Sequence, residues 1–358
     1  MIHDLYKLFL YSDDNFKQVG IYKKNNIFLG GFMENDRLLL AFVEWPERYT
    51  YSGVNIYDVQ KGFDKPAKYI AIPPKSQSKP VDKLLTVQYT SDNYCVISTQ
   101  ETFFGVEAFT RYLCGGYAIG YAKPYFAKIE KNQMSLYKEI NYGGEKYEDF
   151  EIRQIIYGTK LIHCLGKRHP KYVSQGVLPP DSSVVLYYAG YNPEERRIMQ
   201  NGNIYKTISD PNSYDFGTVS LNVMKDKAFV AFTLHKHPYS GLLDGNIKQT
   251  SSDIYFFESD QPANTIKISE GFLPNVKFDS KGNVHVLATD SDGRLFIIRK
   301  DKDNKWTDKQ FILKDVKISS DFLFKDKYID AEFDKDGNLH VVYPANDGNI
   351  VYVKMKLD

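Results

Sequence analysis

Four segments of the chain concentrate the residue types that could bind or transform a polar ligand. They span residues 44–53, 99–116, 166–183 and 235–252. Aromatic rings can stack on the apolar faces of sugars, while arginines and carboxylates form charge-assisted hydrogen bonds with hydroxyl or acidic groups. The predicted ligand-binding residues in these segments are Trp45, Arg48, Tyr49, Arg111, Tyr112, Arg168, Tyr172, His235, His237 and Tyr239.

Three further residues of the same segments are candidates for proton transfer. His169 follows Arg168, and a neighbouring cation keeps an imidazole neutral and able to act as a general base. A glycoside hydrolase would use two carboxylates about 5 to 10 Å apart, whereas a polysaccharide lyase would combine a base, an acid and a cation that holds a uronate. The predicted catalytic residues are His169, Glu101 and Glu107, and both chemistries remain open.

The sequence predicts no metal and no cofactor. His235 and His237 would face the same side of an extended segment, but no third ligand is placed beside them. Neither a glycine-rich phosphate loop nor a Gly-x-Ser-x-Gly turn occurs. The three cysteines form no Cys-x-x-Cys pair and have apolar or glycine neighbours, so we expect buried thiols at Cys95, Cys114 and Cys164.

Charge and hydropathy argue against several classes of partner. The chain has 46 basic and 45 acidic residues, and its formal net charge of +1 gives no field that attracts nucleic acid or an anionic membrane. No segment approaches the roughly 20 apolar residues of a membrane helix, so we expect a soluble protein without membrane insertion. The first residues lack the pattern of a secretory signal. The location is unknown: secreted or cell-surface if a signal was removed, otherwise cytoplasmic.

Two segments near the end of the sequence repeat one pattern. Residues 276–287 and 331–342 each contain two alternating strands around an Asp-x-x-Gly-Asn turn, and the copies are 55 positions apart. Gly282 and Gly337 are predicted to supply the positive φ of these turns. A spacing of this length is typical of one four-stranded propeller blade. His285 and His340 occupy equivalent positions, so we expect them to be structural and to pair with backbone groups.

A unit of four strands with this spacing fits the chain six times. Its innermost strands are predicted at residues 27–32, 84–89, 150–156, 218–223, 274–278 and 329–333, and the outer strand of the third unit at residues 203–208. The sixth unit lacks an outer strand, and pairing residues 2–11 with residues 349–356 would remove an open sheet edge. The predicted fold is all-β: a six-bladed β-propeller of four-stranded antiparallel blades, a single domain over residues 1–358, closed by the N-terminal strand in the last blade.

The loops that follow the second strand of each unit gather on one face of such a ring. They are short in the last two units and long in the first four, where they are the four segments described above, and long loops in a compact domain are more often functional than idle. The sequence therefore predicts a carbohydrate-binding or carbohydrate-processing propeller, with a glycan or another polar small molecule on the face formed by the long loops of blades 1–4. The alternative is a non-catalytic propeller that docks a protein partner.

The rhythm of strands and turns resembles the sialidase-like six-bladed propellers with Asp-box repeats, which bind or process glycans. The Asp-box of that group reads Ser-x-Asp-x-Gly-x-Thr-Trp. The nearest string here, Ser291-Asp292-Gly293-Arg294, departs from it, and Trp306-Thr307 has the reverse order. A Phe-Arg-Ile-Pro string is also absent. The resemblance therefore implies the fold and a link to glycans, and no sialidase residue is transferred to this chain.

Overall fold

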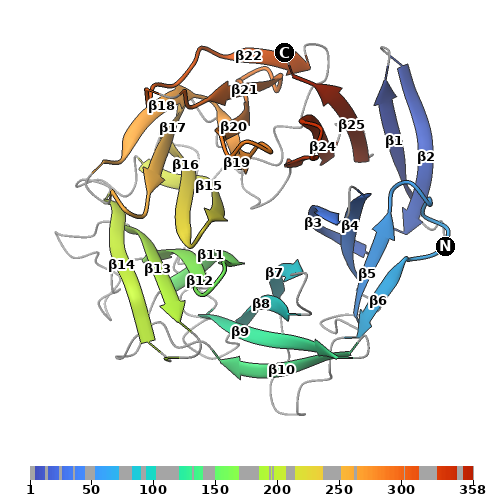
Figure 1. Ribbon diagram of the computed structural model, residues 1–358, viewed down its shortest axis with the longest axis horizontal. Coiled ribbons are helices and arrows are strands. Elements are labelled where there is room, and N and C mark those ends of the chain that lie inside the picture. Colours follow the sequence, from blue (N-terminus) through green and yellow to red (C-terminus); the bar gives the residue numbers. More distant parts are fainter. Residues whose placement is uncertain are drawn as a thin grey trace, which may run out of the picture.

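The computed structural model describes the chain as strands and turns. Within the described residues every regular element is a β-strand, and no helix there is long and apolar enough to cross a membrane (Figure 1). The described residues are 5–12, 15–23, 26–34, 37–44, 53–71, 83–89, 94–101, 121–130, 133–139, 150–168, 185–192, 195, 197–206, 214–236, 251–261, 264–301, 303–313, 329–344 and 350–357.

Three sheets each contain four antiparallel strands in chain order. The first consists of β11 (Phe150–Tyr157), β12 (Ile162–Arg168), β13 (Val185–Asn192) and β14 (Arg197–Lys206). The second consists of β15 (Tyr214–Met224), β16 (Lys227–Lys236), β17 (Ser251–Glu258) and β18 (Ile266–Glu270). The third consists of β19 (Phe272–Phe278), β20 (Val284–Thr289), β21 (Leu295–Arg299) and β22 (Gln310–Leu313).

Two more groups of four antiparallel strands share one eight-stranded sheet. One group is β3 (Asn26–Glu34), β4 (Arg37–Glu44), β5 (Gly53–Asp58) and β6 (Lys68–Ala71). The other is β7 (Lys83–Tyr89), β8 (Tyr94–Glu101), β9 (Tyr121–Glu130) and β10 (Gln133–Glu139). The outer strands β6 and β10 join in parallel through Ala71 and Gln133. This junction was not predicted, since it depends on the ends of two outer strands meeting in space.

The last sheet combines the two ends of the chain. It has the order β2-β1-β25-β24-β23, with the strands β1 (Leu5–Ser12), β2 (Asn15–Lys23), β23 (Asp330–Phe333), β24 (Asn338–Pro344) and β25 (Ile350–Lys356). Strand β1 runs parallel to β25, in a register that extends from Leu8 opposite Ile350 to Tyr11 opposite Val353. The N-terminal strand therefore lies beside the C-terminal one.

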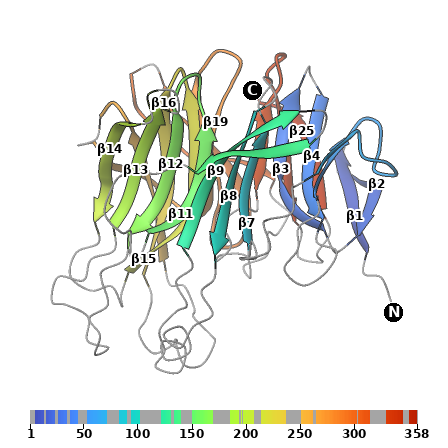
Figure 2. The same cartoon turned by 90° about the horizontal axis from the view of Figure 1, so that it is seen from below.

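The sheets stand around a central axis as the blades of a propeller do. Figure 1 shows the first strand of each group near the centre, and β10, β14, β18 and β22 on the rim. Successive inner strands contact one another, among them β11 with β15, β15 with β19, β19 with β23, and β23 with β3. From the side, the strands run between the two faces of the ring (Figure 2). This arrangement brings residues from distant parts of the sequence to the axis.

The repeated turns have the predicted geometry. Gly282 has a φ of 81° and Gly337 a φ of 79°, in the left-handed region. Oδ1 of Asp279 accepts the backbone N–H groups of Lys281 and Asn283, both at 2.9 Å. The second copy repeats these contacts around Asp334. Each turn is therefore held by one carboxylate that caps the N–H groups left unpaired where the strand ends.

The core consists of the apolar layers between neighbouring sheets. All six residues of β20 are buried, because other sheets cover both of its faces. One layer packs Leu287 and Ile297 against Leu339 and Val341 of the adjacent sheet. On β12, Cys164 is fully buried, as predicted. Because both faces of these strands are buried, polar side chains are expected mainly at the edges of the inner strands and in the loops.

The strands overlap all six predicted innermost segments, but two outer elements differ from the prediction. Strand β14 begins at Arg197, whereas the sequence predicted a start at residue 203. The Asn201-Gly202 pair is typical of a turn, yet both residues pair with β13 inside the strand. Strand β2 was not predicted, because its residues lack a clear apolar alternation and it is stabilised by pairing with β1.

Candidate functional site

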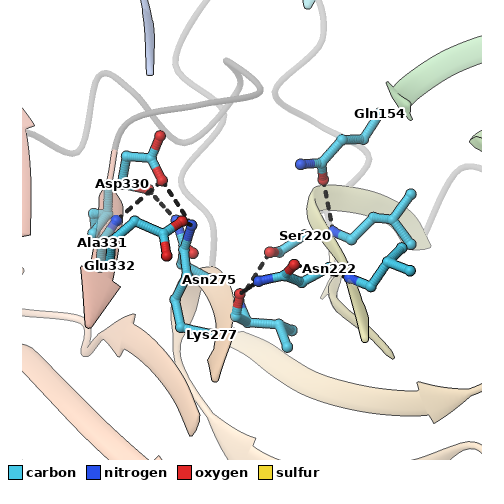
Figure 3. A network of polar contacts seen from close by, with 12 residues as sticks. Gln154, Ser220, Asn222, Asn275, Lys277, Asp330, Ala331 and Glu332 are labelled. Carbon is cyan, nitrogen blue, oxygen red and sulfur yellow. Dashed lines mark hydrogen bonds and ion pairs between the residues drawn. The ribbon is translucent and has the colours of Figure 1, made fainter. Parts of the chain in front are cut away.

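Polar side chains occupy matching places on the inner strands. Ser220 on β15, Asn275 on β19 and Asp330 on β23 are 55 residues apart, which is the length of the repeat. Gln154 on β11 corresponds to Ser220, since each accepts a backbone N–H of the next inner strand. Because these strands surround the axis, the equivalent residues form part of a polar ring there (Figure 3).

On the first part of this ring, each side chain bonds to the backbone of the next inner strand. Oε1 of Gln154 accepts the N–H of Leu221 at 2.6 Å, and Oγ of Ser220 accepts the N–H of Val276 at 2.9 Å. Nδ2 of Asn222 donates to the carbonyl of Val276 at 3.0 Å. Adjacent sheets are thus tied together at the axis, where their inner strands have no partner in their own sheet.

The ring becomes charged between β19 and β23. The side-chain amide of Asn275 donates to the carbonyl of Ile329. Two residues further on, Nζ of Lys277 contacts Oδ1 of Asp330 at 3.0 Å and Oε1 of Glu332 at 2.7 Å. Both carboxylates contact the same ammonium group, so they lie close to each other at the axis (Figure 3). We call Lys277, Asp330 and Glu332 the axial triad.

The triad changes the proton affinity of its members. Burial alone would lower the pKa of Lys277, but the attraction of Asp330 and Glu332 outweighs it and raises that pKa. Burial raises the pKa of Glu332, and repulsion from Asp330 adds to this, while Lys277 acts in the opposite direction. Lys277 therefore stays protonated, and Glu332 retains a proton to higher pH than an ordinary glutamate. An accessible carboxyl of this kind can accept hydrogen bonds or transfer a proton.

The repeated histidines pair with carboxylates of the turns. Nε2 of His285 lies 3.2 Å from Oδ2 of Asp279, and Nε2 of His340 lies 3.1 Å from Oδ2 of Asp334. Nδ1 of His340 also bonds to the hydroxyl of Tyr352 at 2.7 Å. Burial lowers the pKa of both histidines, although their aspartates oppose the shift. Their contacts are structural, as predicted, but the predicted backbone partner is wrong, because the turn aspartate reaches back to the imidazole.

A third histidine has a similar setting and was not predicted. Nδ1 of His163 lies 2.7 Å from the hydroxyl of Tyr188, and Nε2 lies 3.7 Å from Oδ1 of Asp226 in the next sheet. Burial lowers the pKa of His163 to about 4, despite the attraction of Asp226. A Cβ at Gly158 would lie 2.5 Å from Oδ1 of Asp226, so only glycine leaves room for this contact between sheets.

Three of the predicted site residues lie at the ends of described strands. Glu101 is the last residue of β8, Arg168 is the last of β12, and His235 is the penultimate residue of β16. These are the second strands of three consecutive groups. Outside the described residues lie Trp45, Arg48, Tyr49, Glu107, Arg111, Tyr112, His169, Tyr172, His237 and Tyr239.

The axial residues were not predicted, because all predicted site residues belong to the four long-loop segments. A signal was nevertheless present in the repeat itself. Lys277 and Glu332 hold the same place in its two copies, flanked by residues of the strand core. A polar residue at the same place in successive inner strands indicates the axis of a ring. In the part of the chain that the structure describes, no group of three or more histidine, cysteine or acidic side chains could hold a metal ion.

Comparison with known proteins extends to fold alone. No family model matches the sequence, and no curated protein matches it. Among solved structures, the α-L-arabinofuranosidase from Fusarium graminearum in complex with an iminosugar inhibitor is 11% identical, with a TM-score of 0.56 over 99% of this chain and 97% of that one. The α-L-arabinanase from Penicillium chrysogenum complexed with arabinobiose is 10% identical, with a TM-score of 0.53 and 93% of both chains covered.

A third similar structure is that of a polysaccharide lyase. The PL25 ulvan lyase bound to a glucuronate and sulfated rhamnose disaccharide unit is 12% identical, with a TM-score of 0.51 over 92% of this chain and 83% of that one. At these identities the likeness concerns the path of the backbone. Together with the radial sheets of Figure 1, it assigns the chain a propeller-type β fold.

Proposed function

We propose that this protein is a carbohydrate-binding or carbohydrate-processing propeller. The observation that carries the proposal is the axial triad, in which a lysine of β19 meets two partly accessible carboxylates of β23 at the centre of the ring. Loops from every blade meet at the axis, so polar groups there can contact one ligand from several sides. The similar enzymes named above act on or bind glycans, and this supports the proposal by likeness of fold.

We further propose that residues 1–358 form a single six-bladed domain. The blades would be β3–β6, β7–β10, β11–β14, β15–β18, β19–β22, and β23–β25 completed by β1. The pairing of β1 with β25 supports a ring closed by the N-terminal strand. The sialidase-like type remains part of the proposal. Its support is the Asp290 turn, in which Oδ1 accepts the N–H groups of Asp292 and Arg294.

The proposed ligand site lies on the face formed by the loops of blades 1–4. Equivalent strands of a ring run in the same direction, so the ends of β8, β12 and β16 belong to one face. Glu101, Arg168 and His235 lie at or next to those ends. Of the triad, Asp330 lies toward this face, because it begins β23 close to where β24 ends, whereas Lys277 and Glu332 are the penultimate residues of β19 and β23. The loop residues would contact the ligand beside Asp330.

Docking of a protein partner is the weaker candidate. The large apolar side chains that are exposed in the described part of the chain are Tyr69, Met199 and Ile266. They belong to β6, β14 and β18, on the rim of three different strand groups. Single exposed apolar residues are ordinary, and a stable interface needs a continuous patch.

A screen of the purified chain on a glycan array tests the proposal, followed by calorimetric titration of each glycan that binds. Arg168→Ala and Arg111→Ala should weaken binding by about 1 to 3 kcal/mol through loss of a charge-assisted hydrogen bond. Arg197→Ala, on an exposed outer strand, is the matched control and should change nothing. If the folded protein binds no glycan of any class, the proposed function is wrong.

Product analysis on the bound glycan then decides between the activities. A hydrolase releases saturated sugars with new reducing ends. A lyase releases an unsaturated uronate that absorbs ultraviolet light, because elimination leaves a double bond conjugated to the carboxylate. Binding without either product identifies a carbohydrate-binding module.

A further inference from the structure

One buried histidine takes its carboxylate partner from the neighbouring sheet. His285 and His340 each pair with the aspartate of the turn directly before them. The turn before His163, residues 158–161, contains no acidic residue. The carboxylate beside His163 is that of Asp226, in the turn between β15 and β16 of the next sheet. This contact therefore joins two sheets, whereas the equivalent contacts stay within one sheet.

The turn that carries Asp226 has a strained backbone. Lys225 and Asp226 have φ values of 51° and 58°, in the left-handed region that residues other than glycine adopt only at a cost. Oδ1 of Asp226 accepts the backbone N–H groups of Lys160 and Leu161, at 2.9 and 3.1 Å. Asp226 thus caps a turn of another sheet, as Asp279 caps its own. Breaking these contacts would let the strained turn relax.

The imidazole of His163 lies beside this carboxylate without a hydrogen bond to it. Nδ1 lies 2.7 Å from the hydroxyl of Tyr188, whereas Nε2 is buried and has no hydrogen-bond partner among the described residues. The distance of 3.7 Å between Nε2 and Oδ1 of Asp226 is too long for a hydrogen bond. A proton on Nε2 would therefore be a buried charge with no acceptor at bonding distance, which is costly.

The strands around the ring add no second charge to this site, within the described residues. On β11, the residue opposite His163 is Ile156. On β13, the hydroxyl of Tyr188 donates to the neutral side chain of Gln200 on β14, and burial raises the pKa of that hydroxyl. Cys164 follows on β12 and is buried. Asp226 is therefore the charged group that the ring faces, and burial lowers the pKa of His163 to about 4 in spite of it.

The charged neighbours of Asp226 point to other partners or to solvent. Lys225 is exposed, and so is Lys160 on the opposite turn. Lys227 pairs with Glu258 and Asp260. Asp226 itself is held by backbone N–H groups, which lower the pKa of its carboxyl, so it stays ionised in mild acid. A proton taken up at this contact therefore goes to the histidine.

From the carboxylate shared across two sheets, the strained turn and the unpaired Nε2, we infer that Asp226 is a latch between the sheets β11–β14 and β15–β18 that opens locally in mild acid. Opening brings water to the imidazole of His163, which can then accept a proton. The sheets remain joined elsewhere, because Gln154 bonds to the N–H of Leu221 and Thr265 bonds to the carbonyl of Ile204. The inference does not depend on the proposed glycan function.

Amide hydrogen exchange of the full chain at pH 7 and pH 5, read by NMR and corrected for intrinsic rates, tests the latch. The pKa of His163 is about 4 in the closed contact and 6.5 ordinarily, so the opening constant should be about twentyfold larger at pH 5. The protection factors of the Lys160 and Leu161 amides, which Asp226 caps, should fall by that factor. Both amides should exchange much faster than those of the buried strand β20, which report global unfolding.

The control amides are those of Asp292 and Arg294, which Asp290 caps in a turn without a histidine. Their protection should be the same at both pH values. Protection of Lys160 and Leu161 that is constant, or that rises in acid, overturns the latch. Opening constants equal to those of β20 also overturn it, because the contact would then break only when the whole molecule unfolds.

Two variants locate the effect. His163→Gln removes the titrating group, so protection of Lys160 and Leu161 should no longer depend on pH. Gly158→Ala should lower their protection at least about tenfold at pH 7, because its Cβ would lie 2.5 Å from Oδ1 of Asp226 and 2.9 Å from Nε2 of His163. Thr159→Ala, at an exposed residue of the same turn, is the matched control and should exchange as the wild type does.

Thermal midpoints show which variants are folded. A folded His163→Gln protein that keeps the pH dependence overturns the inference, and so does a folded Gly158→Ala protein with undiminished protection. If neither variant folds, exchange in the wild type decides.

Discussion

At the scale of single residues, the inner strands depend on charges that are paired between sheets. Lys277 is the clearest case, because two carboxylates from the next sheet converge on one ammonium group. Removing one member of such a group costs more than the group itself contributes, since the remaining charges lose their compensation. The triad therefore contributes to the stability of the inner strands β19 and β23.

Replacement of this lysine should be severe. Lys277→Met should lower the free energy of unfolding by about 3 kcal/mol, because Asp330 and Glu332 would face each other without a cation. The loss should shrink in acid, where Glu332, whose pKa is raised by burial, takes up a proton. Denaturant titration followed by fluorescence measures the effect. Lys267→Met, at a lysine that is 44% exposed and paired with Asp253 and Glu270, should cost less than about 1 kcal/mol. Equal losses for the two variants would contradict this reading.

The buried histidines make stability dependent on pH. The pKa of His163 is lowered from its ordinary value of 6.5 to about 4, mainly by burial. The unfolded chain therefore takes up a proton before the folded one does, so stability is complete above about pH 6.5 and is lost as the pH falls toward about 4. Each pKa unit corresponds to about 1.4 kcal/mol, which makes this loss roughly 3 kcal/mol.

Variant His163→Gln should make this pH dependence shallower. Its free energy of unfolding, measured at several pH values between about 7 and 4, should fall less steeply than that of the wild type. His285 and His340 keep part of the slope, because burial lowers their pKa values too. An unchanged slope in the variant would show that His163 does not titrate as its burial implies.

At the scale of elements, one turn design recurs along the described part of the chain. An aspartate begins the turn and accepts the N–H groups of the residues two and four positions later, as around Asp279, Asp290, Asp301 and Asp334. The residue three positions after the aspartate has positive φ: a glycine in three of these turns and Asn304 in the other. Hydrogen bonds from the local aspartate therefore determine the backbone geometry of these turns, whichever sheet they belong to.

Substitution at Gly337 tests this design without a steric complication, since a Cβ there would meet nothing within 4 Å. Gly337→Val should destabilise the protein by about 1 to 2 kcal/mol, because a β-branched residue adopts positive φ only with strain. Gly337→Asn should cost clearly less, as the asparagine of the Asp301 turn implies. Thermal unfolding of both variants provides the comparison. Equal costs would mean that φ does not control this turn.

At the scale of the whole molecule, the ends of the chain meet in one sheet. Strand β1 covers the edge of β25, and β2 lies outside β1. An uncovered edge strand exposes a row of unpaired backbone groups, which invites association with other chains. The N-terminal strand therefore covers the edge that β25 would otherwise expose.

Deletion of residues 1–12 should expose this edge. We expect aggregation or a large fall in the thermal midpoint, measured by light scattering during a thermal ramp. Deletion of residues 1–4, which keeps β1 whole, is the matched control and should behave as the full chain does. A protein without residues 1–12 that stays monomeric with an unchanged midpoint would refute closure by β1.

The sequence alone determined the elements whose signal is local. Alternating apolar residues and Asp-anchored turns located the inner strands, because the side-chain period of two and the positive φ of Gly282 and Gly337 are properties of short segments. The burial of Cys164 followed from its apolar neighbours. Strand β2 and the start of β14 were missed, because partner strands stabilise them more than their own residues do.

Only the tertiary structure decided which distant residues meet at the axis. Lys277 and Glu332 are 55 residues apart, and the position of each in the repeat was visible in the sequence, but their pairing was not. Pairing depends on how far one sheet is rotated against the next, and that rotation results from packing of whole apolar layers. The same is true of His163 and Asp226, which belong to adjacent sheets. Sequence periodicity determines which side chains lie on each face of a strand, whereas the packing of neighbouring sheets determines which residues those side chains contact.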